Sequence, residues 1–345
     1  MKVNIKNIFS KKIIKNYTDD ELKAEIQELE SIDYSKLDDH DLSYSHYGYV
    51  QTFKVIADGL RFSTLKQFSA GMLAGFWIGA AYTAVLYASY KLGNPSLEKL
   101  MTGLLFSGVI LLISFLGGGF VTAHMWINRS MFKGVERWRN YAKACGLVYI
   151  GNIVGIGIFV SILLLANAFN AEQFEYLYDH FSRDKLGWIG TAIQNGGIGS
   201  LTTGKTFQTI GYIFASAILC NFLICLATQG AKSTKGNTVA TMIMYLLVLF
   251  FFAIGGYQHC VANWYGVWVG ILAPLTNTGS EVVINNDMGW ALIVFNIIPV
   301  FIGNWVGAYI MGAIMSWYNK EYEVLLVKQY RIRTLTEELA SRTKK

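Results

Sequence analysis

His259 is the side chain whose type and surroundings point most directly to chemistry. It stands in residues 236–280, a run of 45 residues without Asp, Glu, Lys or Arg. Ionisable groups are rare inside membranes and usually face a bundle interior or an aqueous cavity. An imidazole exchanges protons near neutral pH and forms hydrogen bonds. His259 is therefore either a core histidine bonded to a neighbour or a pore group that gives a hydrogen bond or a proton to a solute.

Other polar residues stand at the edges or in the interior of similar apolar runs. Thr122 follows a glycine triplet, and Lys205 precedes the charge-free run 206–231. Thr122 is either a packing residue or the polar counterpart of His259, and Lys205 on its own is typical of an interfacial anchor. Asn152, Asn221 and Asn304 are suited to hydrogen bonds between helices. The charge-free runs contain no carboxylate, which argues against a proton relay of acids, a cation pump or a sodium site.

Metal, cofactor and nucleic-acid chemistry find little support. The four cysteines lie in apolar runs, where they are expected as small buried side chains rather than as a disulfide or zinc set: Cys145, Cys220, Cys225 and Cys260. The net charge is +6, but no basic stripe interleaved with aromatic residues lies outside the membrane-flanking segments. We expect no cofactor, no metal ion and no nucleic-acid partner.

The elements that position these residues are apolar helices. The chain has 345 residues, 53% hydrophobic and 15% charged, against about 25% charged in a typical soluble domain. Continuous apolar runs longer than about 20 residues fit transmembrane helices rather than the short alternating strands of a barrel. The charge-free runs are 67–90, 100–128, 144–171, 206–231, 236–280 and 288–319. They predict an all-α polytopic membrane protein with six transmembrane helices over residues 67–317.

Two of the six predicted helices are broken. Residues 236–272 as one straight helix would reach about 55 Å, far more than a bilayer core of about 30 Å. The natural break is Gly255-Gly256, just before His259, and Gly117, Gly118 and Gly119 interrupt the second run in the same way. Irregular backbone at membrane depth is tolerated only where it is buried in protein or lines a watery cavity. We therefore expect both breaks beside a functional site.

The broken helices are the second of each group of three, and a sequence echo supports a repeat. Residues 150–155 read IGNIVG and residues 302–307 read IGNWVG, 152 positions later. With three helices per half, the second half enters the membrane from the opposite side, which makes the repeat inverted. Interrupted helices at equivalent positions of such halves indicate a transport site near the membrane midplane.

Charged segments flank the predicted membrane domain. Residues 1–66 predict a cytosolic extension with a helix that starts after Thr18 and an amphipathic interfacial helix over 53–65, and residues 318–345 predict a cytosolic helical tail. Basic residues concentrate in the second and fourth connections and in the tail, whereas the fifth connection carries Glu281 and Asp287. By the positive-inside rule, we expect a multi-pass protein of the cell membrane with both termini cytoplasmic.

Several motifs, in order over about residues 60 to 320, resemble those of the formate/nitrite transporter family. They are Ala74-Gly75-Phe76-Trp77-Ile78-Gly79, Gly119-Phe120-Val121-Thr122, Gly151-Asn152, Cys220-Asn221-Phe222-Leu223-Ile224-Cys225-Leu226-Ala227, Gln258-His259-Cys260-Val261-Ala262-Asn263 and Asn296-Ile297-Ile298-Pro299-Val300-Phe301-Ile302-Gly303-Asn304. The resemblance implies an aquaporin-like fold, a homopentamer with one pore per protomer, and passage of small monovalent anions or their acids.

The resemblance also implies roles for individual residues. His259 is similar to the central pore histidine, Thr122 to the loop threonine that faces it, and Lys205 to a lysine of the outer vestibule, on the sixteen-residue step to Asn221. The remaining counterparts are Phe106, Ile110 and Phe252 for the outer constriction, Phe120 and Val121 for the inner one, and Asn221 and Asn304 for pore-lining asparagines. Gly119 and Gln258 stand where the family commonly has acidic residues.

Two transport mechanisms and one enzymatic reading stay open. In the first, Lys205 attracts the anion of a weak acid and His259 supplies or relays a proton, so that the neutral acid crosses the apolar rings. Formate is the first candidate, with nitrite, lactate and hydrosulfide as others. In the second, a neutral solute passes an aquaporin-like channel and His259 only forms hydrogen bonds. An enzyme with His259 as general base lacks a nucleophile or carboxylate partner, so we expect none.

Overall fold

The computed structural model describes residues 17–39, 41–272 and 287–343, and its regular elements in these ranges are helices. Among the described residues, five helical segments are long and apolar enough to cross a membrane: α3 (Thr64–Ser89), α4 (Pro95–Leu116), α7 (Trp138–Leu165), α10 (Thr203–Ser233) and the stretch Met288–Tyr318. That last stretch comprises α13 (Met288–Leu292), a π-helical turn and α14 (Ile298–Tyr318). The shorter apolar helix α11 (Thr238–Ile254) belongs to the predicted broken fifth span.

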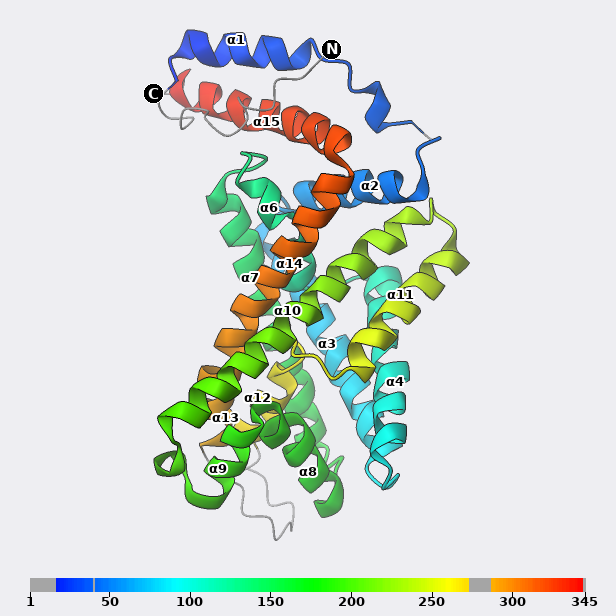
Figure 1. Ribbon diagram of the computed structural model, residues 1–345, viewed down its shortest axis with the longest axis vertical. Coiled ribbons are helices and arrows are strands. Elements are labelled where there is room, and N and C mark those ends of the chain that lie inside the picture. The colour runs from blue at the N-terminus through cyan, green and yellow to red at the C-terminus, as the bar shows by residue number, and fades with distance from the viewer. Residues whose placement is uncertain (1–16, 40, 273–286, 344–345) are drawn as a thin grey trace.

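The helices pack as two equivalent halves. Helix α3 packs against α7 and α4 in the first half, α10 packs against α14 and α11 in the second, and α4 and α11 lie side by side (Figure 1). Glycines of the two IGN motifs permit close contact between the paired helices. A Cβ on Gly155 would lie 2.1 Å from the Met72 carbonyl oxygen, and a Cβ on Gly307 would lie 2.2 Å from that of Ile218. The predicted inverted repeat is confirmed at the level of the fold.

Both helix breaks occur at the predicted glycines. Helix α4 ends at Leu116, and Gly117 and Gly118 follow with φ of 97° and 141° before α5 (Val121–His124) begins. Helix α11 ends at Ile254, Gly256 has φ of 65°, and α12 (Trp264–Leu272) begins eight residues after it. L-residues with a side chain rarely adopt these dihedrals, so glycine makes both breaks possible.

The segment between α7 and α10 forms several short helices at the end of the molecule opposite the chain termini (Figure 1). They are α8 (Ala171–Tyr178), a π-helical turn, a 3₁₀ turn (Asp184–Leu186), α9 (Trp188–Gly196) and a further 3₁₀ turn. Helix α8 contacts α12, and α9 contacts α10 and α13. The same kind of short helix follows α5 on the other side, where α6 (Asn128–Met131) leads to α7.

Three further helices cover the end that carries both termini, here called the terminal side. Helix α1 (Asp19–Glu30) starts with the predicted cap, a capping box between Thr18 and Glu21, and packs along α15 (Lys320–Thr343). Helix α2 (Tyr44–Gly59) differs from the helix predicted over 53–65. Ser43 caps α2 and Ser63 caps α3, so the interfacial helix begins and ends earlier. Residues 1–16 of the predicted extension and Glu281 lie outside the described residues.

Ion pairs attach α15 to the terminal side. Arg61 pairs with both Glu136 and Glu337, and Arg333 pairs with Asp58 at 2.9 Å. Burial alone would raise the pKa of the Glu136 carboxyl, but hydrogen bonds from the Arg61 side chain and from neighbouring amide groups hold this pKa below its usual value. The network therefore depends on ionised Glu136.

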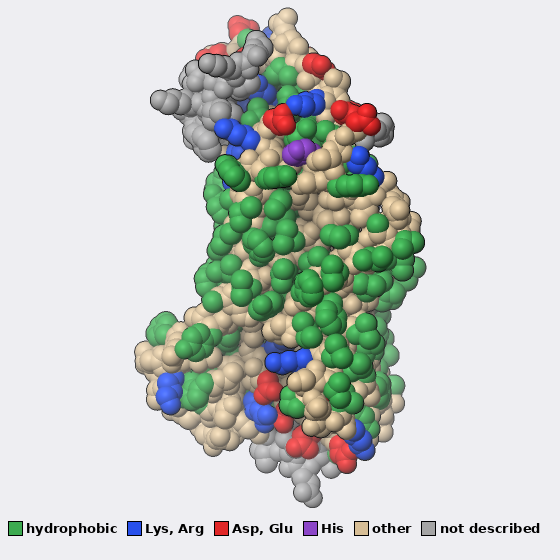
Figure 2. All heavy atoms as spheres, turned by 45° about the vertical axis from the view of Figure 1, so that its right-hand side comes forward, with side chains coloured by type: hydrophobic (Ala, Val, Ile, Leu, Met, Phe, Trp, Pro, Cys, Tyr) green, Lys and Arg blue, Asp and Glu red, His purple; other side chains and the backbone are tan. Residues whose placement is uncertain are grey.

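Hydrophobic and charged side chains separate along the long axis. Figure 2 shows hydrophobic side chains over the middle of the visible face, with charged groups gathered toward its two ends. Large apolar side chains of the apolar helices are half exposed or more, including Leu104 of α4 and Ile243 and Phe251 of α11. A soluble protein of this size rarely exposes so large an apolar surface. The chain is a multi-pass membrane protein.

Candidate functional site

The two broken segments bring His259 and Thr122 together. His259 Nε2 lies 3.1 Å from Thr122 Oγ1, and both side chains are buried. The backbone N–H of Ala262 donates to His259 Nδ1 at 3.0 Å. Because an amide N–H can only donate, Nδ1 is the acceptor and the neutral ring carries its proton on Nε2. The imidazole therefore presents an N–H donor toward Thr122.

Aromatic rings enclose this pair. The Phe120 and Phe252 rings meet the His259 ring edge to face, with centroid separations of 5.6 and 5.9 Å, and Phe106 lies 5.9 Å from Phe252. Only 2% of His259 is exposed, so the ring has almost no contact with solvent in this conformation.

The two other predicted constriction residues belong to the same surroundings. Val121 is fully buried directly before Thr122, and Ile110 is half-buried one turn after Phe106 and packs against the same core. The five residues predicted from the resemblance to form the two constrictions thus belong to one connected core around or beside the histidine.

Two asparagines hold the broken segments in equivalent ways. The Asn152 amide donates to Gly119 O at 2.9 Å, and its oxygen accepts from Val121 N at 3.3 Å. The Asn304 amide donates to Gln258 O at 3.1 Å, and its oxygen accepts from the backbone N–H of residue 260 at 2.9 Å. Each asparagine therefore satisfies backbone groups that the break leaves without helical partners.

Asn221 connects the two halves. Its amide donates to Thr122 O at 3.3 Å and to Asn304 O at 2.9 Å. Asn221 and Asn304 are both fully buried. In this conformation they bond to backbone, and their predicted place along a pore wall stays a prediction. Asn152 belongs to the same set, although its residue type alone predicts only a link between helices. The repeated IGN motif is the signal that relates Asn152 to Asn304.

The structure does not bring Lys205 to the histidine. Lys205 is exposed in the first turn of α10, with its ammonium 5.4 Å from the centroid of the Trp188 ring. It shares α10 with Asn221, sixteen residues later, and that step along a helix spans about 24 Å. The spacing used to predict its role therefore measures a distance along one helix, and the vestibule role of Lys205 stays a prediction.

Lys185 lies beside the second break instead. Its carbonyl oxygen accepts from Gln258 Nε2 at 3.3 Å and from Asn296 Nδ2 at 2.7 Å. Gln258 Oε1 accepts from Asn263 Nδ2 at 2.7 Å. An amide at position 258 both donates and accepts here, whereas a carboxylate could not donate to the Lys185 carbonyl. Sequence reasoning missed Lys185, because nothing local indicates that the segment after α8 folds back toward residue 258.

His124 supports the first break. Its Nδ1 lies 3.1 Å from the Phe120 carbonyl oxygen, one helical turn earlier in the chain. This contact agrees with a structural role. In the described ranges no group of three or more His, Cys, Asp or Glu side chains is placed to hold a metal ion, and the four cysteines are free.

Comparison with known proteins gives matches over the membrane part of the chain. The family model described as "Formate/nitrite transporter" matches residues 49–318. The formate channel FocA of Escherichia coli (strain K12) is 27% identical over 265 residues, which covers 73% of this chain and 86% of the relative. FocA of Haemophilus influenzae is 29% identical over 269 residues, covering 73% and 85%.

Solved structures share the fold. A "pentameric formate channel with formate bound" superposes with a TM-score of 0.60 at 23% identity, covering 74% of this chain and 96% of the other. An "FNT family ion channel" superposes with a TM-score of 0.56 at 18% identity, covering 79% and 98%.

Proposed function

The chain belongs to the formate/nitrite transporter family, and on that premise we propose that it carries a small monovalent anion, or the conjugate acid of that anion, through a pore in each protomer. Formate is the first candidate, because FocA relatives are formate channels. The observation that carries the proposal is the His259–Thr122 pair, which two broken helices hold in an apolar enclosure.

The apolar enclosure makes neutralisation of the anion advantageous. A bare charge at the centre of a bilayer costs at least several kcal/mol, whereas a neutral acid avoids most of that cost. His259 presents Nε2–H as a donor, so an anion that displaces Thr122 from it receives a hydrogen bond. To neutralise the anion, the ring first takes up a proton from water on Nδ1, after Nδ1 leaves the Ala262 N–H, and the resulting cation then gives its Nε2 proton to the anion and returns to the neutral form. The neutral acid then passes Phe106 and Phe252 on one side or Phe120 on the other.

The cation Lys185, next to the second break, attracts the anion toward the Nε2–H donor of His259. Lys185 is half-buried at the end opposite the termini, and its backbone bonds directly to Gln258, the neighbour of His259. We assign to Lys185 the electrostatic role predicted for Lys205, with Lys205 farther out along α10.

Passage requires the constriction to open. The Phe120 and Phe252 rings close around His259, so one or both rings must rotate, or residues 117–120 must move. Glycine at 117, 118 and 119 gives that segment the conformational freedom for such a movement. The proposal therefore places the gate in the first break and the proton donor in the second.

The proposed assembly and orientation follow from similar considerations. A homopentamer is the proposed assembly, supported by the pentameric formate channel of the same fold. The terminal side is proposed to be cytoplasmic, since the basic residues Arg129, Lys133 and Arg137 flank the membrane helices there.

The test is solute-driven acidification in liposomes that contain the purified protein. Formate, nitrite, lactate and hydrosulfide are added one at a time, with and without a proton gradient, while internal pH is recorded. We expect His259→Asn to abolish proton-coupled uptake, and His180→Asn, a half-buried histidine outside the break segments, to leave it intact. Unchanged flux and pH dependence in His259→Asn would remove this histidine from the mechanism.

A neutral-solute channel is the alternative function. The enclosed neutral imidazole, with one ring nitrogen bonded to backbone, favours it because such a group forms hydrogen bonds without exchanging its proton. Flux of an uncharged solute that is independent of membrane potential and pH would support this alternative over the weak-acid mechanism.

A further inference from the structure

A buried carboxylate of α15 ties this C-terminal helix to the connection that follows the first break. Glu323, in the first turn of α15, is only 2% exposed. It pairs with the Lys133 ammonium at 2.7 Å and with the Arg129 guanidinium at 3.1 Å. The hydroxyl groups of Ser130 and Ser316 also donate to it. These five side chains are here called the Glu323 latch. Because the carboxylate is removed from water, it depends on these partners.

The cations of the latch belong to the far end of a short helical rod that starts at the first break. Helix α5, a 3₁₀ turn (Met125–Ile127) and α6 follow one another over residues 121–131, and the residues at their junctions keep right-handed helical dihedrals. A helix over these residues spans about 16 Å. Thr122 at its start contacts His259, and Arg129, about two turns later, lies on the same side of the rod. The rod therefore joins the constriction to the latch.

Helix α15 holds the same connection at two further points. Thr334 Oγ1 donates to the Val135 carbonyl oxygen at 3.4 Å, and the Arg333 guanidinium lies 3.7 Å from the buried Glu136 carboxylate. The helix begins just after residues 49–318, which the family model matches. The family-matched domain is thus braced at the end of its rod by a helix that lies outside the match.

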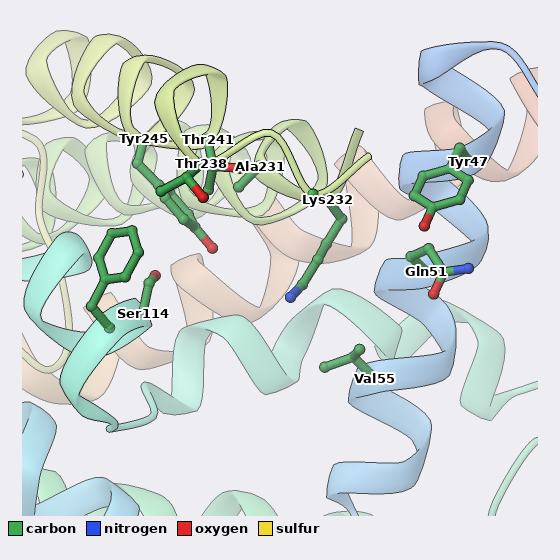
Figure 3. A pocket seen from close by; sticks show the side chains of 11 residues that line it. Tyr47, Gln51, Val55, Ser114, Ala231, Lys232, Thr238, Thr241 and Tyr245 are labelled. Atoms are coloured by element: carbon green, nitrogen blue, oxygen red, sulfur yellow. The ribbon is translucent and has the colours of Figure 1, made fainter. Parts of the chain in front are cut away.

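The end of α4, which leads into the first break, has free space beside it. A cavity of about 430 Å³ lies between α2, α4, α10 and α11, and Figure 3 shows Ser114 of the last turn of α4 at its edge. Phe115 lines the same cavity. The end of α4 therefore has room to shift, whereas the rod that follows the break is fixed by the latch. Opening of the constriction by movement of residues 117–120 displaces the rod, because Phe120 is the cap residue from which the rod starts.

We propose that the Glu323 latch holds the constriction closed, and that Glu323 is a positioning residue that acts on Thr122 and Phe120 through the rod. In this conformation the latch is complete and the aromatic rings are closed around His259. Displacement of the rod separates both cations from a buried carboxylate, which adds to the free energy of opening. Weakening the latch therefore raises the fraction of open pores. The inference rests on the proposed transport and adds to it a contact that controls the gate.

The experiment compares Glu323→Gln with Glu321→Gln. Glu321 is exposed, lies two residues earlier in α15 and pairs with Lys36, so its replacement removes the same charge from the same helix without a change at the rod. Each full-length protein is placed in liposomes, and the initial formate flux per amount of folded protein is measured against formate concentration. We expect Glu323→Gln to raise the maximal flux about tenfold, the population change for loss of about one charge-assisted hydrogen bond from the closed state. The half-saturating concentration should match wild type, because the contacts around His259 are unchanged.

Two further variants test whether the contact with the rod is responsible. Lys133→Gln removes one cation and keeps Arg129, so it should raise the maximal flux about threefold, and it decides the question if Glu323→Gln does not fold. The double variant Lys133→Gln/Glu323→Gln should match Glu323→Gln alone, because both changes break the same contact. A maximal flux that falls or stays unchanged in Glu323→Gln, as a purely structural role requires, would overturn the proposal. So would an equal rise in Glu321→Gln or multiplied effects in the double variant.

The same experiment separates this inference from the proposed transport. If neither the wild type nor Glu323→Gln moves any of the four solutes, the proposed transport fails and the latch fails with it. If the wild type transports formate and Glu323→Gln behaves as Glu321→Gln does, only the latch fails.

Discussion

Asn152 and Asn304, with their hydrogen bonds to the backbone of the two breaks, are here called the asparagine clamps. Replacing Asn152 by Ala tests whether these clamps hold the broken helices. The fully buried Asn152 side chain bonds to Gly71 O, Gly119 O and Val121 N at 2.8, 2.9 and 3.3 Å. Gly71 lies inside α3, where its carbonyl keeps a helical partner. The substitution therefore leaves two backbone groups of the break, Gly119 O and Val121 N, without a partner. An orphaned buried polar group costs about 1–3 kcal/mol, and side-chain hydrogen bonds between membrane helices average about 0.6 kcal/mol. We expect a loss of about 2 kcal/mol.

The assay combines thermal stability with transport. A loss of about 2 kcal/mol lowers the apparent melting temperature of a protein of this size by about 3 °C. Formate flux should fall at least tenfold, because residues 117–120 lose the bond that positions Phe120 and Thr122. Ser161→Ala is the matched control, since the Ser161 hydroxyl bonds only within its own helix, to Gly157 O at 2.8 Å. Equal melting temperatures and fluxes for the two variants would refute the clamp.

Three further predictions concern the donor pair, the helix contact and the terminal side. Thr122→Val should lower formate flux about tenfold without changing assembly on size-exclusion chromatography, because His259 Nε2–H loses its partner. Gly307→Val should prevent recovery of folded protein, since its Cβ would lie 2.2 Å from the Ile218 carbonyl; normal recovery would contradict the close contact. Because folding lowers the pKa of Glu136, its ionised carboxylate contributes its full stabilisation above about pH 4.5, and this contribution is lost as pH falls through the folded-state pKa. Glu136→Gln should flatten the melting temperature between pH 5 and 3, and an unchanged acid profile would contradict this.

Helix content, the two breaks and the repeat could be predicted because each has a local signal. A bilayer allows few charges and limits helix length, so charge-free runs and an overlong run at 236–272 already indicate spans and a break. Glycine at 117–119 and 255–256 then locates the irregular backbone. The IGN motif indicates the repeat, because close helix contact requires glycine at the same place in each half.

The position of the cation beside the site could not be predicted in the same way. The sixteen-residue spacing between Lys205 and Asn221 could not be converted into a distance before the structure showed that both residues lie on α10. Lys185 reaches Gln258 through a fold-back of the chain after α8 that involves long-range contacts. The packing of α1 along α15 is also long-range, with Leu22 of one helix and Leu335 of the other in the same small core.

The clamps explain why the backbone of the site repeats while its chemistry does not. Asn152 bonds to residues 119 and 121, and Asn304 bonds to residues 258 and 260. The side chain between each pair of clamped backbone groups is therefore Phe120 in one half and His259 in the other. Unsatisfied backbone groups impose the same solution on both halves, because each break exposes the same amide and carbonyl. No such requirement acts on the side chain between them, so one half supplies an apolar ring and the other an imidazole that reaches across to Thr122. The two halves therefore differ in the side chain at the break and share the asparagine that holds it. A search for the same functional residue type in both halves would miss this relationship.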